Sequence, residues 1–412
     1  MGRFVSEFFL HRHMLDSGRK KTNTREHLMA TEAGKRAVIL TGHFPMQKRR
    51  ANILWLSDHL RQDGWHVTMI TVGYSLVSKL RGDRRFQQLY APPVVGEIIH
   101  DESLTSVFSY PLLHPFSLRK RILDELARPL HQTFVMHWAR RLPAYLKDAD
   151  LVVVESGPPV MLAPIVRRAA PSAAMVYRVS DDVRVLGLPD FVVRAEMKYA
   201  PLFDRVSMAS PLLGRRFAHL GNLKIDPIGV AKRLLDGDLE DPFAGLPRAR
   251  REAVCAGTTQ FDIKAMRLMA KLRPTWNFHI LGRLREEAWN EPENLIFHGE
   301  LPFDQTAGYV KYADIGLAPY LDKPGVEYQT AQSNRMLIYR YFGLPMIGPK
   351  SICDPHIPTL VGYDSDSEIS MAEALDNLES MSRRGPDPYV QDWSVLYERI
   401  VSTPKPRVSL VS

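Results

Sequence analysis

Short apolar runs alternate with amphipathic stretches along most of this chain. Near the N-terminus, an apolar run at 37–40 is followed by a turn at 41–50, helical spacing over 51–62 and a second apolar run at 67–72. This order predicts a βαβ unit, because parallel strands need a crossover connection between them. Open parallel sheets bind ligands at the carboxyl ends of their strands, so the turn at 41–50 lies on the expected ligand edge.

The same alternation continues to the C-terminal part of the chain. Further strands are predicted at 151–154, 175–179, 206–208, 278–281, 295–297, 314–318 and 345–347, and a second βα series begins at 253–259. Between the two series, the charged segment 231–252 holds two prolines and lacks a strand pattern, which is typical of a linker. We therefore expect two doubly wound α/β domains that face each other across a cleft. The predicted parts are an N-terminal arm at 1–35, a first domain at 36–230, the linker at 231–252, a second domain at 253–386, and a closing helix with a tail at 387–412.

Composition supports a globular two-domain protein. The 412 residues exceed what one core usually holds, and 45% hydrophobic with 24% charged residues are ordinary values. The only cysteines, Cys255 and Cys353, are far apart and have no metal-like spacing, so we expect a reducing, cytoplasmic setting without structural zinc. No run of about 18 apolar residues could span a bilayer, and no signal peptide is expected.

Positive charge is concentrated in the first part of the chain. Residues 1–147 hold 23 Lys and Arg against 12 Asp and Glu, a balance of +11, whereas the whole chain carries +8. Nucleic acid, anionic lipid and a diphosphate-bearing substrate could each explain this surface. Within 74–128, basic residues are interleaved with aromatic and aliphatic ones, which favours contact with an anionic membrane; the alternative is that the apolar members are core. The residues assigned to an acceptor, diphosphate or membrane surface are His43, Lys48, Arg49, Arg81, Arg84 and Arg85.

Polar loops follow the strands predicted for the second domain. They are Gly257-Thr258-Thr259, His298-Gly299-Glu300, Pro319-Tyr320 and, at a helix start, Ser333-Asn334-Arg335. Each is ordinary loop sequence by itself, but strand ends in register predict that they surround one ligand. Hydroxyls, a cation and a helix N-terminus together favour phosphate, while a glutamate could bind a ribose and a tyrosine could stack on a base. The predicted binding residues are Thr258, Thr259, Glu300, Tyr320, Ser333, Asn334 and Arg335.

Two adjacent carboxylates, Asp181 and Asp182, follow the strand at 175–179 in the first domain. Both rarely point at one substrate, so we expect one to act as a general base and the other to be structural. The alternative is a helix N-cap beside a solvated acid. No GxGxxG, Walker A, GxSxG or HExxH motif occurs, and no metal site is expected.

Several of these segments resemble a known family. The loop order Gly-Thr-Thr, His-Gly-Glu and Ala-Pro-Tyr, with the ending Ser-Asn-Arg…Tyr…Phe-Gly-Leu-Pro, is similar to GT-B glycosyltransferases. More narrowly, residues 42–50, 72–75, 81–85 and 177–182 resemble the xanthan-type glucuronosyltransferase (GumK) family. The resemblance extends over 36–400 or so and leaves the N-terminal arm outside.

The resemblance implies an inverting, metal-independent enzyme without a cofactor, peripheral to the cytoplasmic face of the bacterial inner membrane. It would transfer glucuronate from UDP-glucuronate to the mannose of a polyprenyl-diphosphate-linked oligosaccharide, forming a β-1,2 bond in exopolysaccharide synthesis. Its partners would be the UDP-sugar, the lipid-linked acceptor and an anionic membrane surface, but no nucleic acid.

The resemblance also implies roles for individual residues. Asp181 matches the base, with Asp182 as second choice, and Glu300 and Tyr320 match nucleotide contacts. Arg335 replaces the family's lysine at the donor phosphates, which keeps the charge but changes its geometry. Asn334 stands where the family has an apolar residue. Ile338 occupies the position at which many GT-B enzymes hold the ribose with an acid, so ribose binding is expected elsewhere.

Other functions stay open at this point. Another UDP-sugar transferase of GT-B fold, or a sugar-nucleotide epimerase, could use the same two-domain layout. A nucleic-acid binder would suit the pI of 9.3, but the basic part of the chain shows no recognition motif.

Overall fold

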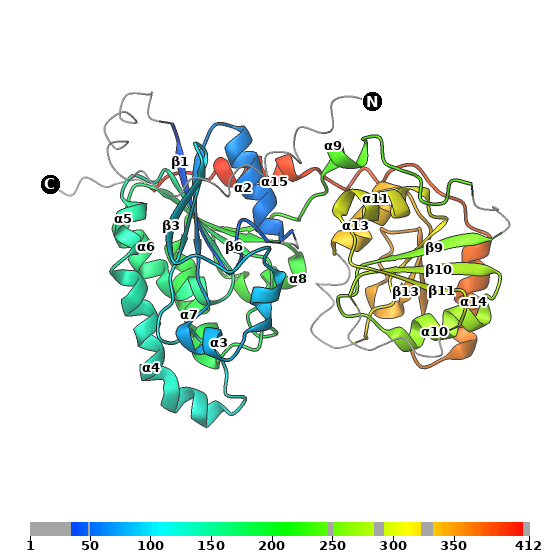
Figure 1. Ribbon diagram of the computed structural model, residues 1–412, viewed down its shortest axis with the longest axis horizontal. Helices are drawn as coiled ribbons and strands as arrows, with labels where there is room; N and C mark the ends of the chain where they lie inside the picture. Colours follow the sequence, from blue (N-terminus) through cyan, green and yellow to red (C-terminus); the bar gives the residue numbers. More distant parts are fainter. Residues whose placement is uncertain (1–33, 48–49, 246–249, 284–291, 323–332, 407–412) are drawn as a thin grey trace. The chain divides into compact units, whose positions relative to one another are not determined.

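A computed structural model describes residues 34–47, 50–245, 250–283, 292–322 and 333–406. Two sheets flanked by helices make up this part of the chain, the first drawn from blue to green and the second from yellow-green to orange in Figure 1. The predicted α/β class with two doubly wound sheets is therefore confirmed. The predicted arm at 1–35 lies almost entirely outside the described residues.

The first sheet has eight strands in the order β3-β4-β2-β1-β5-β6-β7-β8, and only β3 is antiparallel to its neighbour. Their bounds are β1 Arg36–Thr41, β2 His66–Thr71, β3 Gly96–Asp101, β4 Leu104–Phe108, β5 Leu151–Glu155, β6 Ala174–Val179, β7 Arg205–Met208 and β8 Leu223–Ile225. The helices of this part are α2 Asn52–Gln62, α3 Leu76–Leu80, α4 Arg121–Ala139, α5 Leu142–Leu146, α6 Ala163–Ala169, α7 Asp190–Tyr199 and α8 Pro211–Gly214.

The second sheet has six parallel strands in the order β11-β10-β9-β12-β13-β14. Their bounds are β9 Arg251–Ala256, β10 Trp276–Leu281, β11 Leu295–Gly299, β12 Ile315–Leu317, β13 Met346–Pro349 and β14 Leu360–Tyr363. The helices that follow β8 along the chain are α9 Lys232–Leu235, α10 Ile263–Leu272, α11 Phe303–Tyr312, α13 Asn334–Tyr341, α14 Glu368–Glu379 and α15 Trp393–Val401.

Each sheet has one point at which the strand order reverses direction. In the first sheet this point lies between β1 and β5, and in the second it lies between β9 and β12. The loops that leave such a pair of strands diverge to opposite faces of the sheet and leave a crevice, which is where open α/β sheets bind ligands. The loops after these four strands are thus the places where functional residues are expected.

Burial on both faces of the first sheet follows from alternation along its strands. In β1, Ala37 and Ile39 belong to one hydrophobic cluster, while Val38 and Leu40 belong to another. Successive side chains of a strand point to opposite faces, so a continuous apolar run fills two layers of core. This explains why the strands of both domains could be predicted as uninterrupted apolar segments.

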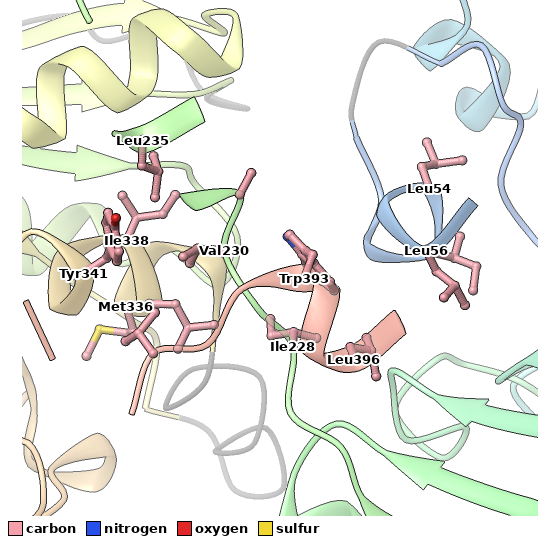
Figure 2. Packing of buried hydrophobic residues seen from close by; sticks show 14 of the residues in the cluster. Leu54, Leu56, Ile228, Val230, Leu235, Met336, Ile338, Tyr341, Trp393 and Leu396 are labelled. Carbon is pink, nitrogen blue, oxygen red and sulfur yellow. The ribbon is translucent and has the colours of Figure 1, made fainter. Parts of the chain in front are cut away.

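The last helix of the chain packs on the first helix of the first domain. α15 lies against α2, and the rings of Trp55 and Trp393 stack with centroids 6.2 Å apart. Figure 2 shows Trp393 and Leu396 of α15 among other members of the cluster, including Val230 after β8 and Met336 of α13. The closing helix predicted near the C-terminus is present, and it completes the core around α2.

The segment 74–128 contains more regular structure than its sequence suggested. It forms the β3-β4 hairpin and the beginning of α4, and several of its aromatic residues are core. Tyr74, Phe108 and Phe44 form a small buried cluster, with Phe86 and Tyr110 packed against it. The interpretation of the aromatic residues here as a membrane surface is therefore wrong for Tyr74 and Phe108, because they are only 4% exposed.

Gly343 sets the turn between α13 and β13. Its φ is +65°, and a Cβ built on it would lie 1.9 Å from the carbonyl oxygen of Arg384. The same glycine accepts a hydrogen bond from the Arg384 amide (2.9 Å), so the two segments cannot move apart without losing it. Only glycine fits this position.

We expect Gly343→Ala to lower the free energy of unfolding by about 2–4 kcal/mol, because it adds left-handed strain to a backbone clash. Denaturant unfolding followed by circular dichroism measures the change. Gly385→Ala is the matched control, since a Cβ there meets nothing within 4 Å. Equal stability of the two variants would contradict this account of the turn.

Candidate functional site

Arg335, in the first turn of α13, is tied to the loop that leaves β9. Its Nε donates to the carbonyl of Ala256 (3.1 Å), and its Nη2 donates to the carbonyl of Gly257. The residue is 5% exposed, and its Nη1 has no hydrogen-bond partner among the residues that the structure describes. A buried guanidinium always carries its charge, so this unsatisfied donor favours an anionic ligand at the end of β9.

Tyr320 and Ser333 complete the surroundings of this guanidinium. The Arg335 guanidinium carbon lies 4.6 Å from the centre of the Tyr320 ring, a cation–π arrangement. The Tyr320 hydroxyl lies 2.6 Å from Ser333 Oγ, and Ser333 caps α13 by accepting from the Met336 amide (3.2 Å). Burial raises the pKa of Tyr320, so its hydroxyl stays protonated and available for this bond. Gly257, Tyr320, Ser333 and Arg335, from three separate loops, are thus brought together.

Thr258 and Glu300 meet at a neighbouring point of the same edge, around Arg283. Thr258 Oγ1 donates to the carbonyl of Arg283 (2.8 Å), and Arg283 Nη2 lies 3.4 Å from Glu300 Oε2. Both side chains of this ion pair are about half exposed or more, so they remain open to a ligand. Arg283 was not singled out from sequence, although it follows β10 directly after a glycine.

Other predicted residues of the second domain lie apart from this group. The exposed Asn334 donates through Nδ2 to Asn52 Oδ1 at the start of α2 (3.1 Å), and Thr259 is exposed beyond Thr258. Ile338 is 6% exposed and belongs to the hydrophobic core. The ring of His298 is bonded to His279 (2.9 Å) and to Tyr309 (3.2 Å), so both of its nitrogens have partners within the domain.

Asp181 follows β6 at the carboxyl edge of the first sheet. It is half-buried, and its backbone N–H donates to Ser156 Oγ (3.2 Å), the residue immediately after β5. Loops from two neighbouring strands therefore hold the backbone of Asp181 at the ligand edge.

Asp182 has a different environment from its neighbour. It is 6% exposed and binds the guanidinium of Arg184 and Arg216 Nη1 (3.1 Å), and Arg216 also pairs with the buried Glu196 (3.1 Å). Burial alone would raise the pKa of Asp182, but the Arg184 hydrogen bonds and the charge of Arg216 lower it. This carboxylate therefore stabilises the fold above the ordinary aspartate pKa of 3.8, and that stabilisation is lost as the pH falls through the lowered value. Asp182 therefore has a structural role.

The predicted basic residues of the first domain differ in how many contacts they make with the fold. Arg81 is exposed after α3, whereas Arg85 lies over the Tyr74 ring (4.2 Å), pairs with Asp83 (2.6 Å) and donates to the Gly73 carbonyl (3.1 Å). Arg85 is therefore part of the local fold as well as of the surface. Arg84 belongs to a short 3-10 helix at Arg84–Gln88. Lys48 and Arg49 lie outside the described residues.

His43 lies in the loop after β1, beside a buried carboxylate that the sequence did not reveal. Its Nε2 is 4.0 Å from Oε2 of Glu155, the last residue of β5, and the Thr41 hydroxyl also donates to that oxygen. Glu155 ends the apolar run Leu151–Glu155 and was overlooked for that reason. Position at the switch point between β1 and β5 is the signal that could have found it.

Comparison with known proteins shows what this chain is similar to. The family model "Glucuronosyltransferase GumK, N-terminal domain" matches residues 39–209. A UDP-glucuronate:glycolipid 2-beta-glucuronosyltransferase of Xanthomonas campestris pv. campestris is 26% identical over 339 residues, which are 82% of this chain and 82% of the relative.

Solved structures show the fold. An alpha,alpha-trehalose 6-phosphate synthase from Burkholderia multivorans aligns with a TM-score of 0.56 at 12% identity, over 89% of this chain and 95% of that one. The E. coli trehalose-6-phosphate enzyme bound with UDP-2-fluoro glucose aligns with a TM-score of 0.55 at 11% identity, over 90% and 96%. The resemblance noted in the sequence is confirmed by the family match over residues 39–209 and by the relative, and the GT-B fold by these structures: the chain is similar to the GumK-type glucuronosyltransferases.

Proposed function

We propose that this enzyme transfers glucuronate from UDP-glucuronate to the mannose of a polyprenyl-diphosphate-linked oligosaccharide. The bond formed is β-1,2, the anomeric configuration is inverted, and no metal or cofactor takes part. The donor and the glycolipid class of acceptor are those named for the Xanthomonas relative. The proposed setting is bacterial exopolysaccharide synthesis at the cytoplasmic face of the inner membrane.

The observation that carries the donor assignment is the unsatisfied Nη1 of Arg335. This buried cation lies beside the N-terminus of α13 and the Ser333 hydroxyl, and all three favour a diphosphate. Negative charge grows on the UDP diphosphate as the bond to the sugar breaks. Preorganised donors of this kind stabilise that charge without reorganising, so they lower the barrier to transfer.

Asp181 is proposed as the general base. It removes the proton from the acceptor hydroxyl, whose oxygen then attacks the anomeric carbon from the face opposite the leaving UDP. Its neighbour Asp182 is bound to Arg184 and Arg216, and its lowered pKa makes it a weak base.

Helix α4 supplies the proposed contact with the membrane. Ile122, Leu126 and Leu130, spaced one helical turn apart, are 76%, 72% and 57% exposed. The preceding basic residues Lys120 and Arg121 are exposed as well. An apolar stripe beside positive charge suits the interface of an anionic bilayer. No helix among the described residues is long and apolar enough to cross a membrane.

The donor site is tested by binding UDP to Arg335→Lys in a calorimeter. Lysine keeps the charge but loses the fork that bonds two carbonyls, so we expect about tenfold weaker binding. Arg340→Lys, on the same helix and paired with Asp387 (2.8 Å), is the control and should bind UDP as the wild type does. Unchanged affinity in Arg335→Lys would remove this residue from the donor site.

The base is tested by comparing two neighbouring variants in a glucuronosyl-transfer assay with a membrane lipid extract. Asp181→Asn should lower turnover about 10²–10⁴-fold without changing the unfolding midpoint. Asp182→Asn should instead lower the free energy of unfolding by about 1–3 kcal/mol, because two arginines lose their partner. Wild-type turnover in Asp181→Asn would exclude it as the base.

Screening UDP-sugars in the same assay tests the donor: labelling of the lipid by another sugar alone would overturn glucuronate.

Membrane contact is tested by co-sedimentation with phosphatidylglycerol vesicles. Replacing Ile122 and Leu126 by Gln should lower the partition coefficient about 100-fold, since each side chain contributes roughly 1–2 kcal/mol on burial. Ile369→Gln removes an equally exposed isoleucine (74%) from α14 in the second domain and should leave sedimentation unchanged. Equal binding by all three proteins would contradict the assignment of α4.

A further inference from the structure

A row of buried polar side chains crosses four adjacent strands at the carboxyl edge of the first sheet. Glu155 of β5 pairs in register with Arg178 of β6, which pairs with Ser207 of β7, and Thr41 of β1 bonds Glu155 from the other side. None of the four is more than 5% exposed. Such groups are costly to bury, and Arg178 Nη2 has no partner in the described part of the chain. Core packing alone therefore does not account for these buried polar groups.

His43 is fixed in one orientation above the β1 end of this row. Its backbone N–H donates to Thr41 Oγ1 (3.1 Å), and its carbonyl accepts from Thr71 Oγ1 (2.8 Å). Gln47 Oε1 accepts from the Phe44 amide (3.2 Å), which directs Gln47 Nε2 toward His43 Nδ1 (3.3 Å). Because that nitrogen faces a donor, neutral His43 carries its proton on Nε2, the nitrogen that faces Glu155.

The separation of His43 Nε2 and Glu155 Oε2 suits a hydroxyl that bridges them. Nε2 and Oε2 are 4.0 Å apart, too far for a hydrogen bond between them. The His43 side chain is 40% exposed while that of Glu155 is 7% exposed, so a ligand can approach from the His43 side. A hydroxyl lodged there would accept from Nε2–H and donate to the carboxylate, which satisfies both groups at once.

We propose that His43 and Glu155 together bind one hydroxyl of the acceptor sugar, other than the attacking one, and so determine acceptor specificity. The inference rests on the proposed transfer to a lipid-linked sugar and names the residues that recognise that sugar. The pair lies at the switch point between β1 and β5, and Ser156, next to Glu155, accepts the Asp181 amide. The site is thus one residue away from a segment that holds the base.

The charge of Glu155 selects the kind of ligand. A phosphate placed in this space would face a buried carboxylate, and repulsion between like charges is strong where water is excluded. A sugar hydroxyl, in contrast, can donate its proton to that carboxylate, and hydrogen bonds to charged groups are among the stronger ones. The diphosphate of the lipid acceptor is accordingly assigned to other groups than His43.

The experiment uses a mannose-terminated oligosaccharide on phytanyl diphosphate, together with its 3-, 4- and 6-deoxy-mannose analogues. With UDP-glucuronate as donor, the wild type should use one analogue about 10- to 100-fold less efficiently in kcat/KM than the parent. His43→Phe, which keeps a ring but removes the N–H, and Glu155→Gln, which removes the charge, should each lose most of that preference. His100→Phe is the control, because His100 lies on the β3-β4 hairpin, where its ring bonds Ser106 (2.8 Å).

The outcomes separate this inference from the proposed function. If the wild type transfers glucuronate but uses all three analogues like the parent, the inference is overturned. It is also overturned if both variants lower kcat/KM equally for parent and analogues, which indicates a structural role. Calorimetry with the same glycans in the absence of UDP-glucuronate measures binding at His43 and Glu155 independently of transfer. Discrimination in binding without any transfer from UDP-glucuronate would support the inference and overturn the proposed donor.

Discussion

Parallel pairing of strands is the constraint on which the functional architecture depends. Parallel neighbours point all their carboxyl ends to one edge, so loops that are distant in sequence end side by side. In the second domain this brings Gly257 after β9, Tyr320 after β12 and Arg335 of α13 to one place. In the first domain the same constraint places Glu155 and Asp181 on neighbouring strand ends. Each half of the reaction thus depends on strand order rather than on any continuous motif.

Residues of the same type differ here in the charges that surround them. Asp181 and Asp182 are adjacent in sequence, but Asp181 is half-buried, whereas Asp182 is buried in a network with Arg184, Arg216 and Glu196. A carboxylate held by two guanidinium groups resists protonation, whereas a base must accept a proton at the moment of reaction. The network also fixes the backbone beside Asp181, so Asp182 contributes to the position of the proposed base.

The fold class and much of the candidate donor site could be predicted from sequence because both follow from local pattern. Apolar runs of strand length specify the sheets, and polar residues directly after them mark the ligand edge, as for Tyr320 and Arg335. Pairings between distant segments gave no local signal. Glu155 looks like the end of an apolar run until Thr41 and His43 are seen against it. Likewise, Tyr74 and Phe108 resemble surface aromatics until they meet in one cluster.

The stacking of Trp393 on Trp55 has a consequence for the synthesis of the protein. These residues are separated by most of the chain, and at roughly 5–20 residues per second the ribosome needs about 20–70 s to go from one to the other. During that interval the apolar face of α2 lacks its final cover, although the last strand of the first sheet, β8, is made well before Trp393. The first domain to emerge is therefore the last to be finished, because its core needs α15.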